Sequence, residues 1–188
     1  MSDPADTHRP DLPGEDLVRR TARMIRVDHA GELAAHRIYR GQLAVLEARG
    51  DYETAALIRE MADHETAHLD RFDELVVARN VRPTALRPLW DVAGFGLGVA
   101  SALLGKNAAM ACTAAVEEVI DAHYGAQEKA LGTDDPELSA VISEFRAEEC
   151  AHRDIALANG AETAPAFGPL SAAIKTGCRI AIKLSERF

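Results

Sequence analysis

The sequence has few aromatic residues and few cysteines, and it lacks the alternating apolar runs that are typical of β-strands. Phenylalanine, tryptophan and tyrosine make up 5% of the 188 residues, whereas alanine, leucine, glutamate and arginine dominate. This composition favours helices. The three cysteines form no disulfide framework and no secretory signal precedes them, so we expect a reducing compartment.

Basic residues are also in the minority. The formal net charge of −9 excludes the broad basic surface that would release counterions from DNA or RNA, so we expect no nucleic-acid partner. Residues 1–16 are acidic and proline-containing, unlike the Arg-rich, acid-poor transit peptides of mitochondrial proteins. We predict a disordered acidic arm at 1–16 and a single domain at 17–188.

What the sequence does contain is a metal-ligand pattern that occurs twice. In each half a lone glutamate is followed, 32 or 33 residues later, by Glu-x-x-His, and corresponding members lie 84 or 85 positions apart. The members are Glu32, Glu65 and His68 in the first half, and Glu117, Glu149 and His152 in the second. One Glu-x-x-His arises easily by chance, but two in register indicate a two-metal site built from duplicated halves.

Turn signals place these residues on four long helices. Gly50 ends the first and Asp51 caps the second; Gly132 ends the third, and Asp135-Pro136 begins the fourth. The predicted helices cover residues 17–49, 52–80, 106–131 and 136–159, so the internal repeat spans 17–80 and 106–159. We therefore predict an all-α, ferritin-like four-helix bundle with a long apolar crossover and an additional amphipathic helix at 169–188.

Each candidate ligand lies in an apolar stripe of its helix. Burying four unpaired carboxylates together costs several kcal/mol for each, and no lysine or arginine occupies these stripes. Two divalent cations would supply the missing charge. Oxygen-rich coordination with two imidazoles and no thiolate favours iron or manganese over structural zinc, and iron is our first choice. The alternative, solvated charges on helix surfaces, is disfavoured by the duplication and by the apolar stripes.

Further polar residues near the ligands leave alternatives open. Tyr39 and Tyr124 each lie two turns from a ligand glutamate, where each is either a hydrogen-bond partner of a ligand or an ordinary core aromatic. His123 either contacts the substrate or a redox intermediate, or has a structural role only. Asp70 and Asp154 follow the ligand histidines by two positions and are candidate partners of those histidines.

The residues around the ligands resemble the demethoxyubiquinone hydroxylase family. The similar stretches are Arg26-Val-Asp-His-Ala-Gly-Glu32, Arg37-Ile-Tyr-Arg-Gly-Gln42 and Ala109-Met-Ala-Cys-Thr-Ala-Ala-Val-Glu117-Glu118, and the resemblance runs from about Ala22 to Phe188. It implies a di-iron monooxygenase of ubiquinone biosynthesis. In that family's pattern, Glu32, Glu65 and His68 hold one iron, Glu117, Glu149 and His152 hold the other, and Glu65 and Glu149 bridge the two.

The resemblance also implies the reaction partners. The substrates would be O2 and a polyprenyl quinol, whose ring receives one oxygen atom while the other leaves as water. The chain has no Gly-rich dinucleotide fingerprint and no cysteine cluster for iron and sulfur, so reductant would come from outside or through the quinone. The missing transit peptide fits a bacterial member. A lipid-presenting helper protein is implied by the family, and we expect a homo-oligomer.

Two segments suit contact with a membrane, where a polyprenyl quinone resides. Residues 92–105 are fourteen uncharged residues in a row, fewer than the roughly 20 that span a bilayer. The C-terminal segment carries Lys175, Arg179, Lys183 and Arg187 at steps of four, opposite apolar residues. We predict peripheral binding at the cytoplasmic face of a bacterial cell membrane. The alternative is ordinary packing, with a buried crossover and a lid over the bundle.

Other functions are compatible with the ligand set alone. Another ferritin-like di-iron enzyme, such as a tRNA-nucleoside hydroxylase, has the same chemistry, but the acidic charge counts against it. Iron storage requires a cage of many subunits with a polar outer surface. A rubrerythrin-like peroxidase or a manganese catalase also uses such ligands, although the rubredoxin cysteines that usually accompany the former are absent.

Overall fold

The computed structural model describes residues 15–188, which contain α-helices, one short 3₁₀ helix and no strand. The helices are α1 (Glu15–Ala48), α2 (Tyr52–Ala78), α3 (Arg87–Leu103), α4 (Lys106–Leu131), α5 (Pro136–Ala158) and α6 (Phe167–Ser185), with the 3₁₀ turn at Ala161–Thr163. The all-α prediction is confirmed. The predicted arm lies outside the described residues, except for residues 15 and 16, which belong to α1 rather than to the arm.

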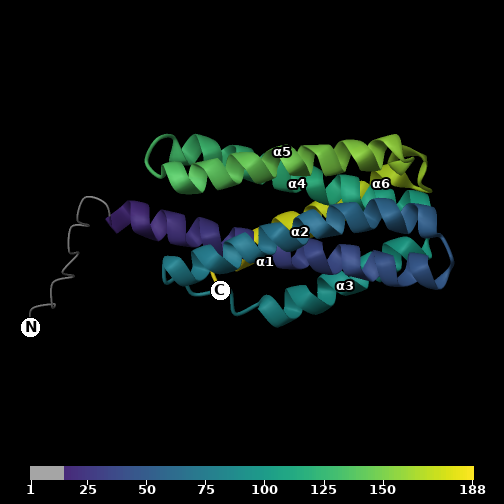
Figure 1. Ribbon diagram of the computed structural model, residues 1–188, viewed down its shortest axis with the longest axis horizontal. Helices are drawn as coiled ribbons and strands as arrows, with labels where there is room; N and C mark the ends of the chain where they lie inside the picture. Colours follow the sequence, from purple (N-terminus) through teal and green to yellow (C-terminus); the bar gives the residue numbers. More distant parts are fainter. Residues whose placement is uncertain (1–14) are drawn as a thin grey trace, which may run out of the picture.

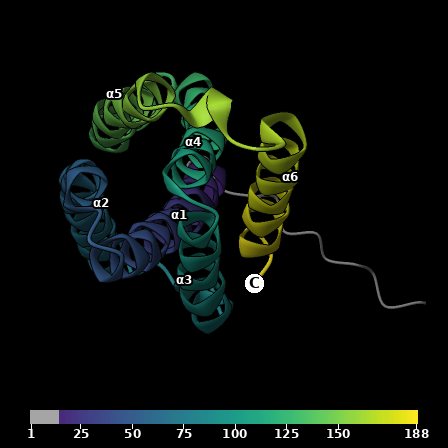
Figure 2. The ribbon, with the colours of Figure 1, turned by 90° about the vertical axis from the view of Figure 1, so that its right-hand side faces the viewer.

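Two helical hairpins form the bundle. Helices α1 and α2 make the first hairpin and α4 and α5 the second, and all four run along the long axis of the molecule (Figure 1). The end-on view shows α2 and α5 together on one side of the bundle, with α1 and α4 between them and α6 (Figure 2). Helix α3 crosses from α2 to α4 and packs along the outside of α1, whereas α6 packs on α4.

The helix ends follow the local signals in the sequence. Gly50 has a φ of +74°, a left-handed conformation that favours glycine, and the side chain of Asp51 accepts a hydrogen bond from the Thr54 N–H. At the start of α5, Asp135 likewise accepts from the Leu138 N–H, 3.1 Å away. The capping predictions are therefore confirmed, and both hairpin loops stay short because each stop is followed closely by a new cap.

Two apolar clusters fill the bundle, one toward each end, and the candidate ligands lie between them. One cluster includes Tyr39, Leu46, Ile58 and Met110; the other includes Ile25, Phe72, Tyr124, Leu131, Leu138 and Ile142. Every helix of the bundle contributes to both clusters. Burial of this apolar surface therefore fixes all four helices on both sides of the polar centre.

Helix α3 is not the buried crossover that was the alternative to membrane contact. It packs on α1 through small residues, because Gly94 lies against Ala34, and a Cβ at Gly98 would stand 2.0 Å from the carbonyl oxygen of Ile38. Such contacts bring two helix backbones close together. The opposite face of α3 is open, with Leu89 51% and Val92 70% exposed. The small side is thus buried and the larger apolar side chains face outward.

Helix α6 begins two residues earlier than predicted and ends three residues earlier. The Trp90 indole N–H donates to the Ser185 hydroxyl at 3.0 Å, and Lys175 pairs with Glu118 at 2.6 Å, so α6 is held against both α3 and α4. Its outer face exposes Arg179, Ile180 and Lys183. Among the described residues, no helix combines the length and the apolar character needed to cross a membrane.

We predict opposite effects for two glycine substitutions in α3. Gly98→Ala forces the α1–α3 contact apart and should lower the free energy of unfolding by about 1–3 kcal/mol, the usual range for overpacking. Gly96→Ala is the matched control, since a Cβ there meets nothing within 4 Å, and it should raise stability by about 0.5–1 kcal/mol. Urea unfolding followed by circular dichroism measures both, and equal effects would contradict the close contact.

Candidate metal centre

The six side chains of the duplicated pattern converge at the middle of the bundle. All six are at most 1% exposed. Their possible ligand atoms form two groups, within each of which the atoms lie within 4.8 Å of one another. One group contains Glu32, Glu65, His68 and Glu149; the other contains Glu65, Glu117, Glu149 and His152. Glu65 and Glu149 are common to both groups, which is the arrangement that two ions with shared carboxylates require.

Each histidine directs its Nδ1 atom toward the carboxylates. His68 Nδ1 lies 3.3 Å from both Glu32 Oε2 and Glu149 Oε1, and His152 Nδ1 lies 3.2 Å from both Glu65 Oε1 and Glu149 Oε2. Within residues 15–188, Glu65 Oε2 has no hydrogen-bond partner, and Glu65 Oε1 meets His152 Nδ1 without forming a hydrogen bond. Buried polar atoms without partners are costly, and divalent cations would satisfy them. The donor set therefore fits a pair of metal ions.

The pKa shifts of the converging side chains also favour bound cations. Burial, together with repulsion from Glu149 and other carboxylates, raises the pKa of Glu65 and of Glu117 well above the usual range. Burial alone would lower the pKa of His68, but its contacts with Glu149 and Glu32 raise it to about 12. Four buried carboxylates cannot all stay charged without compensation, so the centre requires either protons or cations.

Two tyrosines hold the outer glutamates across the duplicated halves. The Tyr39 hydroxyl, on α1, donates to Glu117 Oε1 on α4 at 2.6 Å, and the Tyr124 hydroxyl, on α4, donates to Glu32 Oε1 on α1. The structure therefore decides the open question for both tyrosines in favour of hydrogen bonding to a candidate ligand. In each glutamate the second oxygen, Oε2, accepts no hydrogen bond among the described residues, and in Glu32 this oxygen lies 3.3 Å from His68 Nδ1, on the side of the candidate centre.

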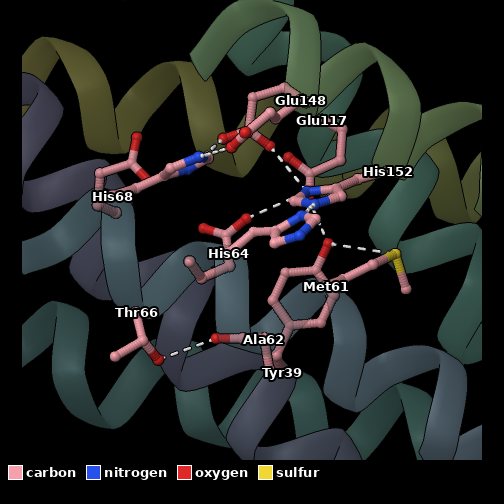
Figure 3. Close-up of polar contacts among 12 residues, drawn as sticks. Tyr39, Met61, Ala62, His64, Thr66, His68, Glu117, Glu148 and His152 are labelled. Carbon is pink, nitrogen blue, oxygen red and sulfur yellow. Dashed lines mark hydrogen bonds and ion pairs between the residues drawn. The ribbon is translucent and has the colours of Figure 1, made fainter. Parts of the chain in front are cut away.

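The outer partners of the histidines are not the predicted aspartates. Asp70 and Asp154 are exposed, because two positions along a helix turn a side chain about 200° away from the histidine. Instead, His68 Nε2 lies 2.5 Å from Glu148 Oε2, and His152 Nε2 lies 3.0 Å from His64 Nδ1 (Figure 3). A signal was present in the sequence, since His64 and Glu148 each immediately precede a ligand glutamate and are 84 positions apart.

His123 lies outside this cluster. Its Nε2 atom is 3.0 Å from Oδ1 of the buried Asp28, which also accepts a hydrogen bond from the Gln127 amide at 2.7 Å. The imidazole borders a surface pocket together with Arg23 and Glu186. The structure therefore gives His123 a hydrogen-bonding role, and contact with a substrate stays a prediction.

An apolar groove runs beneath α6, on the side of α1 and α4 away from α2 and α5. Its outer part, about 490 Å³, lies between α1, α3 and α6, and its inner part lies between α1, α4 and α6. Five residues line both parts: Ala34, Ile38, Trp90, Cys178 and Ala181. The inner part reaches Val116 on α4, the neighbour of Glu117. The groove thus leads from the exposed face of α3 and α6 toward the helices that carry Glu32 and Glu117.

The fold and the converging side chains define a ferritin-like helical bundle with a carboxylate–histidine centre suited to metal ions. The chain belongs to the family described as ubiquinone biosynthesis protein COQ7, whose family model matches residues 19–185.

Several named proteins are similar over most of this chain. A 3-demethoxyubiquinol 3-hydroxylase of Rhodospirillum rubrum is 56% identical over 165 residues, which cover 88% of this chain and 77% of the relative. The human NADPH-dependent 3-demethoxyubiquinone 3-hydroxylase is 52% identical and covers 92% and 81% of the two chains. The yeast 5-demethoxyubiquinone hydroxylase is 39% identical, with 88% and 77% covered.

We predict that metal loading of this centre releases protons near neutral pH. His68 carries a proton at pH 7, because its pKa is about 12 in the metal-free protein, and an imidazole must be neutral to bind a metal. Metal affinity should therefore fall as the pH is lowered. Anaerobic Co²⁺ addition in weak buffer with an indicator dye measures the protons, and His68→Gln should release fewer. Loading without proton release would contradict this electrostatic picture.

Proposed function

We propose that this protein is a di-iron monooxygenase that hydroxylates the ring of demethoxyubiquinol with O2 in ubiquinone biosynthesis. The observation that carries the proposal is the pair of ligand groups sharing Glu65 and Glu149, in a chain of the COQ7 family. Glu32, Glu65 and His68 would hold one iron, and Glu117, Glu149 and His152 the other. The names of the relatives favour this substrate over a tRNA nucleoside, and they favour a hydroxylase over iron storage or a peroxidase.

When bound, the iron pair would supply the electrons that reduce O2. The residues of the chain hold and shield that pair. Tyr39 and Tyr124 fix one oxygen of Glu117 and of Glu32, so the other oxygen of each glutamate is turned toward the centre. The two apolar clusters close the bundle on either side and keep bulk water away from the reacting atoms.

Electrons would come from outside the chain, because its helices offer no Gly-rich fingerprint for a dinucleotide and no cysteine cluster. The mouse and human relatives are named NADPH-dependent. We therefore propose that a nicotinamide cofactor or the quinol itself supplies the electrons, and that O2 is the second substrate.

The groove beneath α6 suits the polyprenyl tail of the quinol. It is apolar and connects the open face of α3 and α6 with the helices that carry Glu32 and Glu117. Leu89 and Val92 of α3 are exposed, and α6, which is joined to α3 by the hydrogen bond between Trp90 and Ser185, exposes the cations Arg179 and Lys183. We propose that this face rests on the cytoplasmic surface of a bacterial membrane. We also propose that the chain forms a homo-oligomer and binds a lipid-presenting helper protein.

The first experiment tests chemistry and substrate together. Metal-free protein is loaded anaerobically with Fe²⁺ and mixed with reduced demethoxyubiquinol and ¹⁸O₂, and the quinone is analysed by mass spectrometry. One labelled oxygen in a new ring hydroxyl is the expected result. Oxygen consumption by the iron-loaded protein without labelled quinone would support the metal centre but contradict the proposed substrate.

Removing one shared carboxylate should abolish both metal loading and turnover. Glu149→Ala deletes an oxygen donor common to both groups, but it also relieves crowding around Glu65 and Glu117, so the helical fold should persist. Glu144→Ala, an exposed glutamate of the same helix, is the matched control and should retain full activity. Iron analysis, circular dichroism and product formation give the three readouts. A Glu149→Ala protein with two irons and full turnover would remove the central assignment.

Membrane binding is tested by flotation with anionic liposomes. The wild-type protein should float, and reversing two exposed cations of α6, Arg179→Glu with Lys183→Glu, should reduce the floated fraction by roughly tenfold or more, at about 1 kcal/mol per cation near an anionic surface. The double reversal Arg40→Glu with Lys129→Glu, on α1 and α4, controls for net charge. Equal loss in both variants, or a wild-type protein that stays at the bottom, would argue against this face as the membrane contact.

A further inference from the structure

His64 and Glu148 occupy the same position in the two halves of the internal repeat, immediately before a shared glutamate. Each reaches from its own helix to the histidine of the other half (Figure 3). Glu148, on α5, contacts His68 on α2, whereas His64, on α2, contacts His152 on α5. The position is therefore repeated by the duplication, but its chemistry is not, since one partner is a carboxylate and the other an imidazole.

The contact of His68 is a hydrogen bond to an anion. Its Nδ1 atom faces Glu32 and Glu149 at 3.3 Å, so this nitrogen is the one available to an ion. The proton of the neutral ring then resides on Nε2, which lies 2.5 Å from Glu148 Oε2. A metal-bound histidine that donates to a carboxylate becomes a stronger donor to its metal, because the negative charge is transmitted through the ring.

The contact of His152 is a hydrogen bond to a neutral group. Its Nδ1 atom faces Glu65 and Glu149 at 3.2 Å, and its Nε2 atom lies 3.0 Å from His64 Nδ1. The two rings are nearly parallel, with 5.3 Å between centroids and 19° between planes. His64 Nδ1 must accept the proton of His152, so it supplies orientation without adding a negative charge.

The rest of the two ligand groups is closely matched. Each group contains the shared Glu65 and Glu149, one outer glutamate held by a tyrosine, and one histidine whose Nδ1 atom faces the carboxylates. The outer partner of the histidine is thus the clearest chemical difference between them. Mutations of such partners commonly change metal affinity by about 10–100-fold.

We propose that Glu148 and His64 are positioning residues that make the two metal positions unequal. The position formed by Glu32, Glu65, His68 and Glu149 binds its ion more tightly and fills first, because His68 donates to the carboxylate of Glu148. The position formed with Glu117 and His152 fills second. The inference rests on the proposed two-iron centre and adds an order of loading to it.

Stepwise Co²⁺ titration of the metal-free protein, followed anaerobically by visible absorption, tests the order. The wild-type protein should bind two ions in two separable steps. Glu148→Gln keeps the size of the side chain and removes its charge, and it should weaken the first step by about 10–100-fold while leaving the second in place. His64→Gln should weaken only the second step. His64→Glu should tighten the second step, so that the affinities of the two steps become similar.

Three results would overturn the inference. Two ions bound with equal affinity, or Glu148→Gln and His64→Gln acting on the same step, would show that the partners do not set the order. If the first binding step survived in His68→Gln, the ion that binds first would not occupy the position that contains His68. Circular dichroism of the variants before Co²⁺ addition checks folding, which should hold because His64 is exposed and the side chain of Glu148 is 40% exposed. Failure to bind any Co²⁺ would instead contradict the proposed metal centre itself.

Discussion

Four carboxylates and two imidazoles packed together without bulk water are the constraint on which this structure depends. Each charged group would be costly to bury alone, and burial together with mutual repulsion raises the pKa of Glu65 and Glu117 well above the usual range. Cations relieve that cost only if all six groups stay within a few ångströms of one another. The apolar clusters on both sides of the centre hold four helices in the register that achieves this.

The two halves of the repeat are interdependent. Tyr39 of the first half supports Glu117 of the second, and Tyr124 supports Glu32 in return. The outer partners of the histidines cross over in the same way. Neither half could therefore orient its own ligands, although each carries a complete set. A duplicated hairpin becomes a functional centre only through contacts between its copies, and a difference at one repeated position is enough to break their equivalence.

Helices α3 and α6 lie outside the duplicated bundle and border the apolar groove. The small residues of α3 bring its backbone close to α1, so its larger apolar side chains are left on the open face. Helix α6 is held by Ser185 and Lys175 and covers the apolar groove without filling it. In the proposed function the bundle contributes the metal ions, while these two helices contribute the route by which a membrane-dissolved quinol reaches them.

The sequence by itself determined the helices, their caps and the six converging side chains. These depend on local rules, since a cap requires only its own turn and residues at steps of three, four and seven share a helix face. The tertiary structure alone decided which groups meet across helices. It paired the tyrosines with the opposite glutamates, put His64 and Glu148 behind the histidines in place of Asp70 and Asp154, joined His123 to Asp28, and placed α3 with its small side inward. Such pairings depend on the rotation and spacing of neighbouring helices, which no single helix encodes.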